Sequence, residues 1–404
     1  MKKHFILLFL IFFVSTNAQV WEDNLLNNNP NAGITEKADA FDNYRAKVEY
    51  TKGNGYKPYA RNLDFILQRT SDGKGIPNGK FYIEWLKEKK RFDQHKSTSN
   101  SNWTELGPIN TPIILSNGKK RGNGRINCIA FDPFDKEKIW VGSPGGGLWS
   151  SPDGGNTWST NTDGLPVIGV SYIAINPIDP QEMYITTGDA HASDTYSIGI
   201  LKSNDGGQTW DTTGMQFAVT DDKMVNKVII HPTFTDSLFA VTDNNIKISP
   251  DGGQTWSNAL STSGSVLSGY FRDIEFKPNN PNVLYAVKQT TGSSQVYKSS
   301  DRGQTWSVAM NGISTVNRNR PLLAVTPANP DAVYVLFCMN DYGFHGIYKS
   351  TDNADSWTLQ SDSPNILGRN TDGTSTGGQS WYDLSLGVST EDEDLLYVGG
   401  INPV

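Results

Sequence analysis

Cysteine, histidine and long apolar runs are all scarce in this sequence of 404 residues, which has only two cysteines and five histidines. Cys128 and Cys338 stand 210 residues apart in two apolar, strand-like runs, and neither has a second ligand at the spacing of a zinc site. A fold held together by disulfides is therefore excluded, and stability must come from a large core in which both thiols are buried and free. We expect no cofactor and no metal site built on cysteine.

The one strongly apolar run lies at the start of the chain, from Phe5 to Val14, directly after Lys2 and Lys3. It spans about ten residues, whereas a helix that crosses a bilayer needs roughly 20. Small and polar residues follow it up to Ala18, which is typical of a cleaved signal peptide over residues 1–18. We therefore expect a secreted or cell-surface protein without a transmembrane segment.

An excess of basic residues is also missing. The chain has 35 Lys and Arg against 42 Asp and Glu, a formal net charge of −7. Without the two lysines of the leader, 33 basic residues remain and the formal charge is near −9. A nucleic-acid partner is not expected from this charge, and an extracellular glycan or protein is the expected kind of ligand.

Glycine, proline and tryptophan are abundant, with 39, 20 and 11 copies, and helical patterns are few. This composition predicts an all-β protein of short strands and tight turns. The exception is residues 19–100, an N-terminal helical and linker region that contains GKFYIEWLKEKKRFDQH. Its basic residues predict a solvated helix face, and a helix that docks on a membrane surface or a partner is the alternative.

The octet Ser-x-Asp-x-Gly-x-Thr-Trp occurs four times and, with Ala354 and Ser356 in place of Gly and Thr, a fifth time. Its tryptophans are separated by 52, 46, 50 and 51 residues, which fits one four-stranded propeller blade per copy. The repeated aspartates and tryptophans are Asp153, Asp205, Asp251, Asp301, Asp352, Trp158, Trp210, Trp256, Trp306 and Trp357.

A second repeated element precedes each octet: an apolar strand that ends in proline, a polar turn and another apolar strand. A sixth copy starts at Leu386 with Ser389 in place of the proline, and Trp103 begins an isolated strand that could complete the last blade. Residues 101–404 thus predict a β-propeller with about five blades and part of a sixth. We expect an incomplete ring, and further C-terminal domains in the full-length protein.

The octet suits a tight turn. Its aspartate can accept hydrogen bonds from turn N–H groups, its glycine can adopt positive φ, and its tryptophan can pack between blades. Since every blade repeats the same aspartate, we expect these carboxylates to stabilise turns rather than to act in catalysis.

The five octets resemble Asp-boxes (BNR repeats) of the β-propeller superfamily that includes sialidases, sortilin-like receptors, xyloglucanase-type glycosidases and a photosystem assembly factor. The segments WTELGP, GRINCIAFDP and VGSPGGGLWSSPDGG, which follow one another in this order, also resemble segments of large secreted bacterial proteins with sortilin-like repeats and a C-terminal sorting domain. In that superfamily the box lies at the blade periphery, away from the ligand site.

Three arginines stand where inner strands begin: Arg125, Arg272 and Arg320. Sialidases resemble this arrangement, because they hold a substrate carboxylate with three arginines, and the resemblance implies an anion site. Ion pairs between blades are the alternative. The sialidase signature Arg-Ile-Pro is absent, and no Tyr and Glu nucleophile pair is recognisable.

The loop TGDAHASDTYSIG contains Asp189, His191 and Asp194, which are candidate acid and base groups or calcium ligands, with a hydrogen-bonded structural loop as the alternative. A later insertion contains Trp381 and Tyr382, which are candidates for stacking on a sugar or anchoring a peptide. Core packing beside Leu384 and Leu386 is the other interpretation of that segment.

Two functions follow from these features. The first is a secreted or cell-surface recognition or adhesion module, since every strong motif has a structural explanation. The second is a glycoside hydrolase, either sialidase-like or xyloglucanase-like, although Ser143 and Pro144 stand where xyloglucanase-like enzymes place their first aspartate. A channel with two carboxylates about 5 to 10 Å apart would favour the hydrolase.

Overall fold

The computed structural model describes residues 25, 28–29, 32–47, 56–68, 80–94, 124–192 and 195–400. The chain divides into two compact units, Met1–Ser99 and Asn100–Val404, and each is treated by itself. The predicted signal peptide, the strand at Trp103 and the candidate Asp194 lie outside the described residues.

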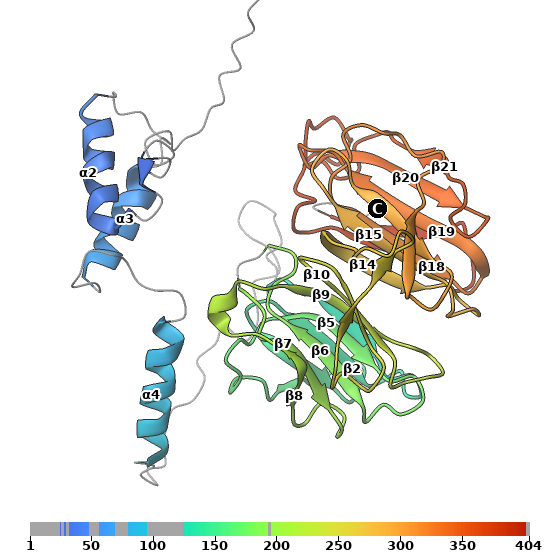
Figure 1. Cartoon of the computed structure of the whole chain (residues 1–404), viewed down its shortest axis with the longest axis horizontal. Helices are drawn as coiled ribbons and strands as arrows, with labels where there is room; N and C mark the ends of the chain where they lie inside the picture. Colours follow the sequence, from blue (N-terminus) through green and yellow to red (C-terminus); the bar gives the residue numbers. More distant parts are fainter. Residues whose placement is uncertain are drawn as a thin grey trace, which may run out of the picture. The chain divides into compact units, whose positions relative to one another are not determined.

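The described part of the first unit includes the helices α2 (Ile34–Arg45), α3 (Tyr56–Leu67) and α4 (Lys80–Gln94) (Figure 1). The rings of Phe41 in α2 and Tyr59 in α3 lie 4.1 Å apart, and Phe41 is buried. The side chains described in α4, residues 83–91, are all exposed. Of the helices in the described ranges, none has the length and apolar character that a membrane crossing requires.

The second unit is built from consecutive antiparallel sheets (Figure 1). Blade 1 is β1 (Cys128–Phe131), β2 (Ile139–Ser143), β3 (Gly147–Ser151) and β4 (Ser159–Thr160); blade 2 is β5 (Val170–Ile175), β6 (Met183–Thr187), β7 (Gly199–Ser203) and β8 (Asp211–Gln216). Blade 3 is β9 (Val225–Ile230), β10 (Leu238–Thr242), β11 (Ile246–Ser249) and β12 (Ser257–Asn258).

Blade 4 is β14 (Tyr270–Phe276), β15 (Leu284–Gln289), β16 (Gln295–Ser299) and β17 (Thr305–Val308), and the short β13 (Leu260–Ser261) pairs in parallel with β17. Blade 5 is β18 (Pro321–Thr326), β19 (Asn329–Cys338), β20 (Phe344–Ser350) and β21 (Thr358–Ser361), and a two-stranded sheet of β22 (Ser385–Val388) and β23 (Leu396–Gly399) follows. The predicted β-propeller of five blades and part of a sixth is confirmed.

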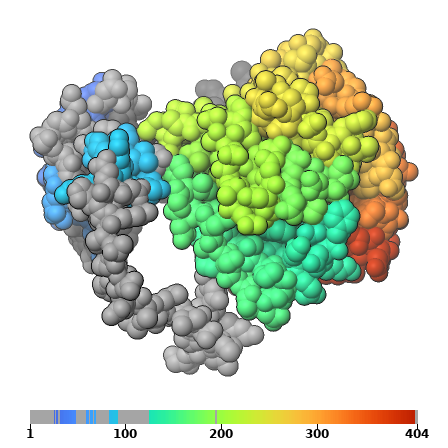
Figure 2. All heavy atoms as spheres, turned by 90° about the horizontal axis from the view of Figure 1, so that it is seen from below, coloured from blue at the N-terminus to red at the C-terminus, as the bar shows by residue number. Residues whose placement is uncertain are grey.

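The innermost strands β1, β5, β9, β14, β18 and β22 pack against one another in chain order and surround a channel. In Figure 2 the red end of the last sheet borders the teal of blade 1. The Arg125 guanidinium, just before β1, lies 5.2 Å from the Tyr382 ring, just before β22. Among the described strands, however, none of the last sheet hydrogen-bonds to blade 1.

The core consists of one apolar cluster at each junction between neighbouring sheets. Between blades 3 and 4, for example, Phe239 and Phe271 are buried with Trp306. Such a repeat of nearest-neighbour contacts spreads the stability of the unit over all of its junctions.

As expected, each octet tryptophan from the second onward packs in the apolar cluster between its own blade and the preceding blade. Trp306 and Trp357, for example, are only 1% and 5% exposed. Trp158 of blade 1 differs from the expectation, because it is 40% exposed. The reason is that no described residues form a blade that precedes blade 1 in the chain and could cover this ring. The thiols also differ: both are free, but only Cys338 is buried and Cys128 is partly exposed.

The octets form the expected hydrogen-bonded turns. The Asp301 Oδ1 accepts hydrogen bonds from the Ser299 hydroxyl at 2.8 Å and the Thr305 N–H at 2.9 Å, and its Oδ2 accepts one from the Thr305 hydroxyl at 2.6 Å. The same contacts surround the other four octet aspartates. Ala354, at the glycine position of the fifth octet, has a φ of 66°, so the turn imposes the left-handed conformation there even without glycine.

Candidate functional site

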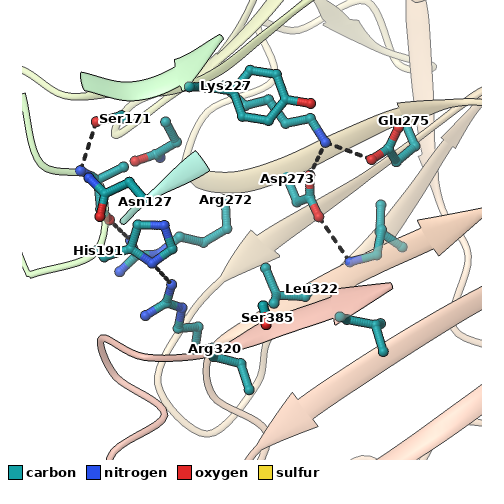
Figure 3. Close-up of a pocket in the computed structure, with 16 residues that line it drawn as sticks. Asn127, Ser171, His191, Lys227, Arg272, Asp273, Glu275, Arg320, Leu322 and Ser385 are labelled. Carbon is teal, nitrogen blue, oxygen red and sulfur yellow. Dashed lines mark hydrogen bonds and ion pairs between the residues drawn. The ribbon is translucent and has the colours of Figure 1, made fainter. Parts of the chain in front are cut away.

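A cavity of about 280 Å³ lies in the channel and is lined by residues in or directly before all six inner strands and by the loop between β6 and β7 (Figure 3). Cavities of ligand-binding sites commonly measure about 300 to 1,000 Å³. This site therefore suits a small ligand or a single end group of a larger one.

Two of the three predicted arginines, Arg272 and Arg320, face this cavity. The Arg272 side chain donates hydrogen bonds to Gln289 Oε1 at 2.5 Å and to the Ala190 carbonyl. Burial lowers the pKa of Arg272, but the guanidinium stays protonated at neutral pH. No carboxylate among the described residues lies within ion-pair distance of it.

Arg320 is 2% exposed and likewise has no ion-pair partner in the described part of the chain. It donates to the backbone carbonyls of Ser380 and Trp381 and contacts His191 Nδ1. Burial, followed by repulsion from Arg272, lowers the pKa of Arg320 to about 9, which still leaves it cationic at neutral pH.

His191 lines the same cavity as a neutral imidazole. Burial, and then the positive charges of Arg320 and Arg272, lower the pKa of His191 to about 3. The uncharged ring can accept a hydrogen bond from Arg320 at Nδ1. The structure thus brings three of the predicted site residues together: Arg272, Arg320 and His191.

Arg125, the third predicted arginine, is used in an ion pair between blades. It contacts the Asp189 carboxylate, which is fully buried, and Asp189 does not line the cavity. Burial alone would raise the pKa of Asp189, but the hydrogen bond and charge of Arg125 outweigh it and lower that pKa. Arg125 therefore forms the ion pair between blades that was the alternative to an anion site. The same ion pair does not favour Asp189 as a catalytic acid or base.

Sequence reasoning missed a buried charge cluster on the other side of the cavity. Lys227 Nζ in β9 lies 2.8 Å from Asp273 Oδ1 and 2.6 Å from Glu275 Oε1, both in β14. Asp273 Oδ2 also accepts the Leu323 N–H of β18 at 3.0 Å. Burial raises the pKa of Glu275, whereas for Lys227 the two carboxylates outweigh burial and raise its pKa.

The spacing in FRDIEF could have revealed two of the three residues of this cluster, because residues two apart on a strand share a face. Asp273 and Glu275 fit that rule. Arg272 lines the same cavity because the register of β14 and β15 shifts between Phe271 and Asp273, and such a bulge redirects side chains. No sequence pattern predicted the bulge.

Two asparagines also line the cavity. Asn127 Nδ2 donates to the Val170 carbonyl at 3.1 Å, and Asn226 Nδ2 donates to the Phe271 carbonyl at 2.6 Å, so each joins its blade to the next. The Oδ1 atoms of both are buried and have no hydrogen-bond partner among the described residues. Both oxygens can therefore accept a hydrogen bond from a ligand.

Trp381 and Tyr382 lie near the cavity but do not line it. Their rings are 4.6 Å apart, and Trp381 is 41% exposed. Leu384 and Leu386, in contrast, line the cavity and pack in the last junction, as the core-packing interpretation expected. Within the described ranges no group of three His, Cys, Asp or Glu residues could hold a metal ion.

Comparison with known proteins relates this chain to sortilin and to xyloglucanases. A family model described as Sortilin, neurotensin receptor 3, matches residues 244–366. A Paenibacillus xyloglucanase is 27% identical over 215 residues, which cover 46% of this chain and 21% of the relative. The Acetivibrio thermocellus xyloglucanase Xgh74A is 27% identical over 219 residues, covering 46% of this chain and 25% of the relative.

The chain is similar to xyloglucanases. It spans about a fifth to a quarter of the length of these curated relatives. Among solved structures, an ancestral GH74 enzyme has a TM-score of 0.52 and 16% sequence identity to this chain. The matched part covers 69% of this chain and 35% of the chain of that enzyme. The GH74 xyloglucanase of Xanthomonas campestris has a TM-score of 0.50 and 15% sequence identity, and the match covers 69% of this chain and 42% of the chain of that xyloglucanase. Both likenesses support the fold.

Proposed function

We propose that this chain is an extracellular recognition module whose propeller channel binds a small anionic ligand through Arg272 and Arg320. The observation that supports this most is that Arg320, which is 2% exposed, and Arg272, which is partly buried, both lie at the cavity without a carboxylate partner in the described chain. A buried charge without a partner is costly, and a ligand carboxylate can compensate it with charge-assisted hydrogen bonds.

The other charged side chains at the cavity support binding rather than catalysis. Lys227 contacts both cavity carboxylates, Asp273 and Glu275. The Asp189 carboxylate is paired with Arg125 away from the cavity. A general acid and a general base must exchange protons with a substrate, and carboxylates held in ion pairs suit that task poorly.

The test is calorimetric titration of the chain with a small carboxylate, glucuronate or N-acetyl-alanyl-leucine, at two salt concentrations. We expect Arg320→Gln to weaken binding at least about tenfold, since a hydrogen bond to a charged group contributes about 1.5 to 3 kcal/mol. The control Arg302→Gln changes an exposed arginine of the fourth octet and should leave affinity unchanged. Equal binding by all three proteins would refute the anion site.

A glycoside hydrolase is the second candidate, favoured by the similarity to xyloglucanases and by the two neighbouring carboxylates that line the cavity, Asp273 and Glu275. Asp273 and Glu275 would then be the channel carboxylates to examine first. Release of reducing sugar from xyloglucan that is lost in Glu275→Gln but kept in Glu391→Gln, a change in an exposed outer turn, would establish this function over the recognition module.

We also propose that the octets are Asp-boxes of the BNR type and that the protein is exported through a signal peptide cleaved after Ala18, with a C-terminal sorting domain in the full-length protein. The octet pattern supports the first of these assignments, and the charged, apolar and small-residue regions of residues 1–18 support export. The resemblance of WTELGP, GRINCIAFDP and VGSPGGGLWSSPDGG, in this order, to large secreted bacterial proteins supports the sorting domain. Mass spectrometry of the protein from culture medium should give Gln19 as its first residue.

A further inference from the structure

The two sides of the cavity have opposite charge. In Figure 3, His191 and Arg320 lie on one side, and Lys227 and Glu275 lie on the other. On the first side Arg272 and Arg320 contribute two positive charges, and neither has a carboxylate partner among the described residues. On the second side Lys227 offsets only one of the two formal negative charges of Asp273 and Glu275, which leaves a formal net charge of −1.

The negative side also has hydrogen-bond acceptors that nothing in the described chain fills. Glu275 Oε1 contacts Lys227, but its second carboxylate oxygen has no hydrogen bond from any described residue. Asn226 is 5% exposed, lines the cavity, and has a buried Oδ1 without a donor. Unfilled acceptors next to a net negative charge are complementary to an ammonium group, which offers three donors and one positive charge.

We infer that the channel binds a zwitterionic ligand, a short peptide or amino acid whose carboxylate lies at Arg272 and Arg320 and whose ammonium group lies at Glu275 and Asn226. This inference rests on the proposed anion site. Leu322 and Leu386 line the same cavity and give the ligand an apolar surface. The cavity of about 280 Å³ matches a ligand of this size.

A sugar acid is the nearest rival because it also has a carboxylate. Its hydroxyl groups are neutral, so it would leave the charge of −1 at Asp273 and Glu275 without a counterpart. Its hydroxyl groups can donate hydrogen bonds to the acceptors of Glu275 and Asn226, but they bring no positive charge. The charges therefore favour the peptide.

The experiment is calorimetric titration of the whole chain with alanyl-leucine, N-acetyl-alanyl-leucine and glucuronate. We expect alanyl-leucine to bind at least about tenfold more tightly than its acetylated form, because acetylation removes one charge-assisted contact. Glu275→Gln should abolish that preference and leave the affinity for the acetylated peptide unchanged. Glu391→Gln, an exposed glutamate in the turn before β23, is the matched control and should keep the preference.

The outcomes separate this inference from the proposed function. Equal affinity for both peptides, with weaker binding by Arg320→Gln, would overturn the inference and keep the anion site. Tighter binding of glucuronate than of alanyl-leucine would overturn it in favour of a sugar acid. If none of the three compounds binds, both proposals fail. Should Glu275→Gln not fold, the comparison of the two peptides on the unaltered chain still decides.

Discussion

The octet aspartates have unusually low pKa values although they lie at the surface of the blades. The pKa of Asp205 is lowered to about 2, first by the hydrogen bond from the Thr209 hydroxyl and then by the Thr209 N–H. The pKa of Asp352 is also lowered to about 2, first by the hydrogen bond from the Ser356 hydroxyl. Donors directed at the ionised carboxylate favour the charged form, so each turn requires its aspartate to be ionised.

A pH dependence of stability follows. Since an aspartate in the unfolded chain has a pKa of about 3.9, these groups stabilise the folded state fully above about pH 4 and lose that effect as the pH falls toward 2. We expect the urea midpoint to fall over this range. Asp205→Asn should reduce the slope, whereas Asp362→Asn, at an exposed loop position, should not. Equal slopes for both variants would contradict this assignment.

At the same scale, the sequence predicted which arginines begin inner strands but not what each contacts. Arg125 pairs with Asp189, whereas Arg272 and Arg320 have no such partner in the described chain. The difference arises from the β6–β7 loop, which places Asp189 beside blade 1 and places the Ala190 carbonyl and the His191 ring beside the other two arginines. Loop conformation of this kind depends on tertiary contacts and has no periodic signature.

At the scale of strands and turns, the repeat predicted the elements well. Each of the prolines that close an inner strand lies one or two residues after β1, β5, β9, β14 or β18, where no ladder hydrogen bond is lost. The short β13 and its parallel pairing with β17 were not predicted, because two residues carry no readable alternation.

The tryptophans at the end of the octets differ in burial, so we expect their removal to cost different amounts of stability. Trp306→Ala should lower the free energy of unfolding by about 3 to 5 kcal/mol, because it opens a cavity in the junction of blades 3 and 4. Trp158→Ala should cost about 1 kcal/mol or less, since its ring is 40% exposed. Urea unfolding of both variants measures the difference, and similar losses would show that blade 1 is covered as fully as blade 4.

For the whole molecule, the order of the blades followed from the repeat, whereas the channel site did not. Its side chains come from blades far apart in sequence: Asn127 from the first, Lys227 from the third and Arg320 from the fifth. Their meeting depends on how the blades are arranged around the channel, and a single sequence without aligned relatives contains no record of such contacts.

We expect the second unit to be stable without the first. Among the described residues, the five apolar clusters of this unit lie between Cys128 and Val398, within the blades. We therefore expect a chain that starts at Asn100 to melt within about 3 °C of the whole protein, because a change of 1 kcal/mol shifts the midpoint of a large domain by about 2 to 4 °C. Calorimetry of both chains gives the comparison. A drop well beyond that range would mean that the helices α2, α3 and α4 stabilise the propeller.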